Sequence, residues 1–136
     1  MQYDEFLKRV QERANLDSQE ETEQLIEVVM TALAEPMSRE ETNRLASQLP
    51  AQIKNVLARN REEPIPAKQT MRSFDPEEFY NRVKGRLSVN YQQGVAQTQA
   101  VMTVVREAVT PSIIDSLLQD LPDGYETLFM REGQRR

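Results

Sequence analysis

Apolar residues recur along the chain with the three-to-four-residue spacing of amphipathic helices. The first such set is Tyr3, Phe6, Leu7, Val10 and Ala14, and the next is Leu25, Ile26, Val29, Ala32 and Leu33. No segment shows the strict alternation of apolar and polar residues that marks a half-buried strand. The pattern therefore predicts an all-α fold.

Residues typical of helix starts divide this pattern into separate helices. Ser18 with Glu21, and Ser38 with Glu41, have the spacing of a capping box. Asp75-Pro76 and Thr110-Pro111 each place an N-cap residue before a proline in the first turn, where its missing N–H costs nothing. Pro50 and Pro122 suit the starts of two further helices, and Phe74 and Phe79 have the spacing of a hydrophobic staple.

The two halves of the chain resemble each other. Glu5-Phe6, Arg9-Val10 and Arg13 recur in the second half, at a constant offset, as Glu78-Phe79, Arg82-Val83 and Arg86. After this offset shortens by a single position, Val29-Met30-Thr31, Glu35 and Leu49-Pro50 recur as Val101-Met102-Thr103, Glu107 and Leu121-Pro122. Self-similarity of this kind marks a repeat architecture. It predicts two tandem four-helix repeats, about eight helices, packed as one compact helical domain.

The expected domain boundaries follow from this repeat. Residues 1–60 form the first helical repeat and residues 74–132 the second. Residues 61–73, which include Pro64 and Pro66, form the linker, and residues 133–136 form a C-terminal tail. A repeat of this size has little core of its own, so we expect a shared core, a pseudo-twofold relation and one cooperative unfolding transition.

The same residues carry a resemblance to a known family. The opening run Tyr3-Asp4-Glu5-Phe6-Leu7-Lys8-Arg9-Val10, the two Leu-Pro elements and the restart from Phe74 to Val83 resemble the bacterial domain-of-unknown-function family number 2267. The resemblance extends from Tyr3 to Phe129, with departures at Gly94, Gln97 and Gln99. It implies a compact helical domain with no agreed biochemical activity, and it brings no active-site residues with it.

Composition argues against most catalytic chemistry. The chain has no histidine and no cysteine, so the usual hydrolase triads, thiol nucleophiles and zinc sites have no side chains to build them. Its four glycines do not form a phosphate-binding loop. We expect a protein that is not an enzyme and that has no cofactor or bound metal.

The charge distribution argues against nucleic acid and membrane partners. The net charge is −5 and there is no basic stripe that could neutralise phosphates. The N-terminus lacks an apolar stretch of signal-peptide length. The segment from Leu87 to Val105 contains no charged residue, but its amide side chains are unsuited to hydrocarbon. We expect a soluble cytoplasmic protein.

Two surfaces are candidates for a partner, and each has a simpler explanation. The acidic residues Glu20, Glu21, Glu23 and Glu27 suit docking of a basic partner, but also helix first turns and a solvated face. The uncharged helix from Tyr91 to Val105, with Gln93, Gln97 and Ala100, suits an interface, because interface centres are depleted in charge. It equally suits a central helix packed between the repeats. Tyr91 and Tyr125 lie at helix starts, where a hydroxyl can stay in contact with water.

Two functions remain. The first is a non-catalytic protein-protein interaction or scaffold module that binds an unknown protein partner or itself. The alternative is a small-ligand-binding helical domain with an apolar pocket between the repeats.

Overall fold

The computed structural model describes residues 1–35, 37–59, 75–121 and 123–129. Within these ranges the chain forms eight α-helices and no strand, which confirms the all-α expectation. The helices are α1 (Tyr3–Ala14), α2 (Gln19–Ala34), α3 (Arg39–Ala46), α4 (Ala51–Arg59), α5 (Pro76–Leu87), α6 (Tyr91–Ala108), α7 (Pro111–Asp120) and α8 (Tyr125–Phe129). The expected linker at residues 61–73 and the tail at 133–136 lie outside the described residues, as do Phe74 and Pro122.

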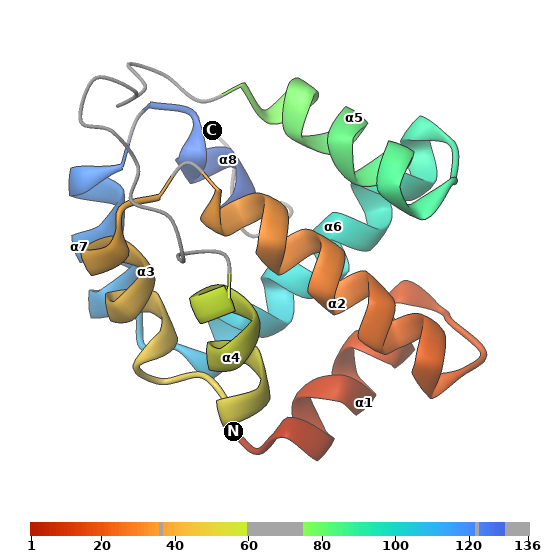
Figure 1. Ribbon diagram of the computed structural model, residues 1–136, viewed down its shortest axis with the longest axis horizontal. Coiled ribbons are helices and arrows are strands. Elements are labelled where there is room, and N and C mark those ends of the chain that lie inside the picture. The colour runs from red at the N-terminus through yellow and green to blue at the C-terminus, as the bar shows by residue number, and fades with distance from the viewer. Residues whose placement is uncertain (36, 60–74, 122, 130–136) are drawn as a thin grey trace.

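The two long helices, α2 and α6, lie at the centre of the molecule (Figure 1). The first helix of each half packs against both of them: α1 packs mainly on α6 and also on α2, while α5 packs mainly on α6 and also on α2. Helices α3 and α7 contact each other, α4 packs on α2, and α8 packs on α6. The first half and the second half therefore meet along most of their helices.

The helix starts follow the capping signals of the sequence. Ser38 and Glu41 form a full capping box, in which the Glu41 N–H donates to Ser38 Oγ at 3.0 Å and the Ser38 N–H donates to Glu41 Oε1 at 2.9 Å. Ser18 supplies the serine half of a box, accepting from the Glu21 N–H at 3.0 Å. Asp75 accepts from the Glu77 N–H at 3.0 Å and stands before Pro76.

The first helices of the two halves also end alike. Asn15 closes α1 with a φ of 57°, and Ser88 closes α5 with a φ of 59°. Both are left-handed C-caps in which a residue other than glycine adopts a positive φ. In the sequence, the offset that relates Arg13 to Arg86 also relates Asn15 to Ser88.

Side chains from both halves fill one core. Fully buried residues in the first half include Phe6, Val10, Val29, Met30 and Leu33, and those in the second half include Val83, Val101, Val105, Leu117 and Tyr125. The hydroxyl of Tyr125 donates to the backbone carbonyl oxygen of Leu33 at 3.3 Å. A helix start can leave a tyrosine hydroxyl in contact with water, but Tyr125 is 0 % exposed, because α8 packs onto α5 and α6.

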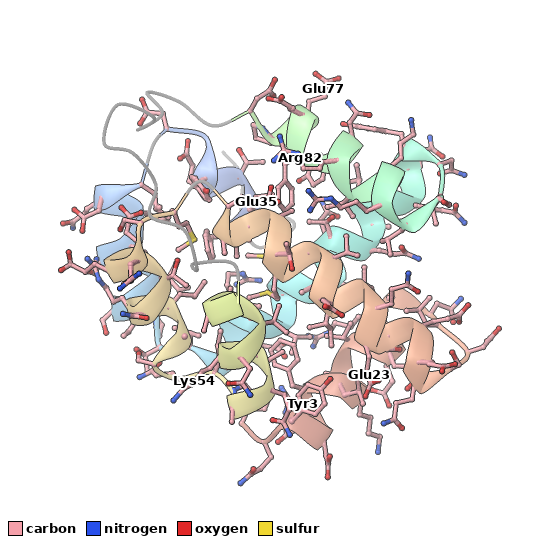
Figure 2. All side chains as sticks on the ribbon, viewed as in Figure 1. Tyr3, Glu23, Glu35, Lys54, Glu77 and Arg82 are labelled. Carbon is pink, nitrogen blue, oxygen red and sulfur yellow. The ribbon has the colours of Figure 1, made fainter. Side chains whose placement is uncertain are left out.

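Two matching ion-pair triads bridge the halves. Glu107 of α6 pairs with Arg9 at 2.9 Å and with Arg13 at 2.7 Å, both on α1. Glu35, which follows α2, pairs with Arg82 at 2.9 Å and with Arg86 at 3.0 Å, both on α5 (Figure 2). Each triad thus holds the first helix of one half against the end of the long helix of the other half.

The Glu107 triad also sets a pH dependence. The hydrogen bond from Arg13 lowers the pKa of Glu107 below its ordinary value of 4.5, and Arg9 acts in the same direction against the opposing effect of burial. A carboxyl with a lowered pKa in the folded state stabilises the fold above its unfolded pKa and loses this contribution as the pH falls through the folded value.

We predict that Glu107→Gln destabilises the fold at pH 7 by about 1 kcal/mol or less, since both partners are partly exposed to solvent. The loss should shrink as the pH falls below 4.5 and disappear at a second, acidic pH below the lowered pKa of Glu107 in the folded state, where the wild-type carboxyl is also neutral. Urea unfolding at the two pH values measures it, with Glu12→Gln as a control of equal charge change. An equal loss at both pH values would contradict the assigned role.

A second prediction concerns the buried hydroxyl of Tyr125. Tyr125→Phe should cost about 1 kcal/mol of unfolding free energy, because the Leu33 carbonyl loses its donor inside the core. Tyr91→Phe is the matched control, since the Tyr91 ring is 37 % exposed, and it should change stability very little. Chemical denaturation followed by circular dichroism decides the question, and one transition is expected for each protein. Equal stabilities for the two variants would contradict the role of the hydroxyl.

Candidate functional site

An uncharged stripe runs along the solvent face of α6. It consists of Gln92, Ala96, Gln99 and Thr103, and we call it the α6 stripe. Their alternating four- and three-position spacing places these side chains on one helical face. Gln92, Ala96 and Gln99 are exposed and Thr103 is half-buried. The stripe presents two carboxamides, a methyl group and a hydroxyl to solvent.

The opposite face of α6 is anchored in the protein. Gly94, Thr98, Val101 and Val105 are buried there. A Cβ atom on Gly94 would lie 3.1 Å from the Cβ of Lys84 and 3.4 Å from the carbonyl oxygen of Tyr80. The glycine therefore allows α5 to approach α6 closely at this point. This packing fixes which face of α6 is left for solvent.

The three α6 residues that the sequence analysis selected differ in their exposure to solvent. Gln93 is exposed and caps its own helix, because its side-chain oxygen accepts from the Asn90 N–H at 3.2 Å. Gln97 is half-buried. Ala100 is 6 % exposed, so including it in a partner surface was wrong: it lies on the side of α6 that packs against other helices.

The candidate partner surface predicted from the sequence did not include Gln92 and Ala96. The available signal was their spacing to Gln99 and Thr103, which continues for three turns without a charge. The uncharged composition identified α6 as unusual, whereas only the spacing of these residues identified the face of α6 that meets solvent.

The acidic residues Glu20, Glu21, Glu23 and Glu27 are all exposed on α2. Glu20 and Glu21 lie in the first turn, where the helix dipole stabilises negative charge. Glu35, although it continues the acidic run in sequence, is engaged by Arg82 and Arg86. Glu23 and Glu27 therefore form the part of the acidic surface that neither a helix start nor the triads explain.

Tyr3 of α1 lies beside this acidic surface (Figure 2). Burial raises the pKa of the Tyr3 phenol above 10.0, and the negative charges of Glu23 and Glu27 raise it further. The phenol therefore stays a neutral hydrogen-bond donor and acceptor next to two carboxylates. The surface formed by Tyr3, Glu23 and Glu27 combines negative charge with an aromatic ring.

Two cavities occur in the described part of the first half. One, of about 290 Å³, lies between α3 and α4 and is lined by Thr42, Asn43, Ala46, Ser47, Lys54, Asn55, Leu57 and Ala58. The other, of about 490 Å³, lies at the end of α1 and is lined by Lys8, Gln11, Glu12, Asn15 and Leu16. Neither of these two cavities lies between the two halves, where the alternative function placed its pocket.

Most of the chain matches the model of one known protein family. The family model of DUF2267, described as an uncharacterized conserved protein, matches residues 3–128. The chain belongs to the DUF2267 family. No curated protein matches it. The match spans both halves, so the α6 stripe, the acidic surface and both triads are parts of the DUF2267 domain.

We searched the described residues of this DUF2267 domain for metal-binding groups and for membrane-spanning helices. Among the described residues, no group of three or more His, Cys, Asp or Glu side chains is arranged to hold a metal ion. Within the same residues, none of the helices has the length and apolar character needed to cross a membrane.

The acidic surface of the DUF2267 domain yields a testable prediction. Changing Glu23 and Glu27 together to glutamine should lower the pKa of Tyr3, because the charges that disfavour the phenolate are removed. The pKa should stay above 10.0, since burial is the larger cause and is unchanged. Ultraviolet absorbance titration at high pH measures it, with Tyr3→Phe identifying the contribution of this tyrosine.

The matched control for this experiment is Glu20→Gln with Glu21→Gln, which removes the same charge from the first turn of α2. An equal shift of the Tyr3 pKa in both double variants would contradict the placement of Tyr3 beside Glu23 and Glu27.

Proposed function

We propose that this protein is a non-catalytic protein-protein interaction or scaffold module whose contact surface is the α6 stripe. The partner is another protein or a second copy of the chain. The observation that carries the proposal is an exposed helical face with no charge across three turns, in a chain in which 29 % of residues are charged.

The physical argument starts from desolvation. A charged side chain at the centre of an interface loses its water and costs several kcal/mol unless it is paired. The carboxamides of Gln92 and Gln99 each offer donors and an acceptor, so they can exchange water for a partner's backbone or amide groups at little cost. Ala96 lies between them and leaves room for a partner helix to approach. Interface centres are similarly depleted in charge.

The acidic surface supports the same class of function with a different partner. Glu23 and Glu27 lie on α2 and face solvent, with Tyr3 beside them. Such a surface favours a basic segment and speeds its association at low salt. We assign the main contact to the α6 stripe, because several of the acids have structural roles at helix starts or in a triad.

The architecture is consistent with a scaffold. We interpret the fold as two tandem four-helix repeats, supported by the matching triads at Glu35 and Glu107 and by the matching left-handed caps at Asn15 and Ser88. We propose a non-catalytic role because the chain contains no histidine or cysteine, the residues that most often act as general base or nucleophile near neutral pH.

A charge-insertion experiment tests the α6 stripe. The test variant carries Ala96→Glu with Gln99→Glu, both on exposed positions of the stripe. The control carries Gln52→Glu with Gln119→Glu, which adds the same charge at exposed positions of α4 and α7. Sedimentation measures self-association, and affinity capture from extracts of the producing cells, read by mass spectrometry, measures partner binding.

We expect the wild type and the control to show the same assembly or the same captured partner, and the stripe variant to lose it by at least tenfold. A third variant, with Glu20, Glu21, Glu23 and Glu27 changed to glutamine, should keep it. Loss in this acidic variant alone would move the contact to α2. Equal behaviour of all four proteins would contradict the proposal.

A second candidate function has one specific observation in its favour. The cavity between α3 and α4 combines an apolar lining of Ala46, Leu57 and Ala58 with Lys54, two asparagines and a serine, and contains no carboxylate. Such a cavity suits a small ligand with one negative charge and a short apolar chain.

A thermal-shift assay with hexanoate tests this second candidate. A ligand present at a hundred times its Kd stabilises the fold by about 2.7 kcal/mol. Ala58→Leu narrows the cavity and should abolish the shift, whereas Ala51→Leu, exposed at the start of the same helix, should leave it unchanged. No shift with the wild type would rule out this ligand class for the cavity.

A further inference from the structure

The contacts between the two halves are reciprocal. The arginine pair Arg9 and Arg13 meets Glu107, and the arginine pair Arg82 and Arg86 meets Glu35. The two arginine pairs, like the two glutamates, are equivalent residues of the sequence repeat. Each half therefore presents both parts of the same recognition pattern: an arginine pair on its first helix and a glutamate at the end of its second.

The packing includes contacts of both kinds across the halves. Helix α1 packs on α6, and α5, its counterpart in the other half, packs on α2 in addition to its more extensive contact with α6 (Figure 1). Helices α3 and α7 contact each other, and there Arg44 donates to Ser116 Oγ at 3.0 Å and pairs with Asp120 at 3.0 Å. A surface that meets its own counterpart in this way has the character of the isologous interface of a twofold dimer.

Nothing in these contacts distinguishes the second half of the same chain from the second half of another copy. The covalent connection between the described halves is residues 60–74. In general, two modules joined in one chain have an effective concentration on the order of 1 mM, which favours closure within a single chain in dilute solution. At comparable protein concentration a second copy competes for the same surface.

We propose that the interface between the halves is a recognition surface for a second copy of this chain. Two chains exchange halves, and both triads form between the copies instead of within one. The inference does not rest on the α6 stripe, which faces solvent outside this interface.

The two triads allow a test in which only the exchanged dimer has complementary charges. The first variant carries Glu107→Arg, and the second carries Arg9→Glu with Arg13→Glu. Each variant alone places like charges within its own Glu107 triad. In an exchanged dimer of the two variants, the unaltered arginine pair of the first variant meets the unaltered Glu107 of the second, as in the wild type. The substituted positions of the two variants meet in the other triad, where both signs of charge are reversed. The Glu35 triads remain unaltered in both chains.

The two variants are unfolded together, refolded as a mixture at a total concentration of about 0.5 mM, and analysed by size-exclusion chromatography and native mass spectrometry. We expect a species of twice the 15.7 kDa chain mass that contains one copy of each variant. Each variant refolded alone should give at least tenfold less dimer. The matched control carries all three substitutions in one chain, and should fold as a monomer.

A wild-type measurement keeps the proposal testable if reversed charges are poorly tolerated. Wild-type protein refolded at about 1 mM should contain dimer, and refolding at about 5 µM should give at least tenfold less. The proposal is overturned if the mixed variants yield no heterodimer and the wild type refolded at the higher concentration stays monomeric. A wild-type dimer abolished by the α6 stripe substitutions would also overturn it, because assembly would then use the stripe.

Discussion

The structure depends on the contacts that the first helix of each half makes across the two halves. Helix α1 packs on α6 and helix α5 packs on α2, in addition to their contacts within each half, so the apolar faces of both first helices complete their burial across the interface. The core that results contains Phe6 and Val10 from one side and Val83 and Val101 from the other. Burial of this apolar surface supplies most of the stabilisation, and the half-exposed triads fix how the helices are paired.

This arrangement determines which surfaces remain for function. Helix α6 uses one face to contact α1, α2, α5 and α8, with Gly94 allowing the close approach of α5. The remaining face is the α6 stripe. The triads also affect the distribution of charge. They engage Glu35 and Glu107, whereas Glu20, Glu21, Glu23 and Glu27 are exposed on α2 outside the triads. Both candidate contact surfaces are consequences of how the halves pack.

The sequence was sufficient for the features that depend on neighbouring residues. Apolar spacing predicted the helices, local hydrogen bonding set the starts at Ser38 and Asp75, and a proline in the first turn marked the start at Pro111, where Thr110 makes no side-chain cap hydrogen bond. Features set by distant residues were harder. The burial of Tyr125 depends on the packing of α8 against α5 and α6, and the burial of Ala100 depends on which face of α6 meets its neighbours. Neither contact has a local signal.

The triads could be predicted from the sequence only in part. Arg9, Arg13 and Glu35 each recur at the repeat offset, so the sequence contained the information that these charges share a role. It did not contain the information that each arginine pair meets the glutamate of the other half, because that depends on the three-dimensional exchange.

Hydrogen exchange in a Glu107→Arg variant tests the interdependence of the halves most directly. The substitution acts on the contact between α1 and α6, far in sequence from the pair formed by α2 and α5. If the halves form one cooperative unit, the most protected amides of all four helices should exchange faster by the same factor. Faster exchange confined to α1 and α6, with α2 and α5 unchanged, would contradict the account.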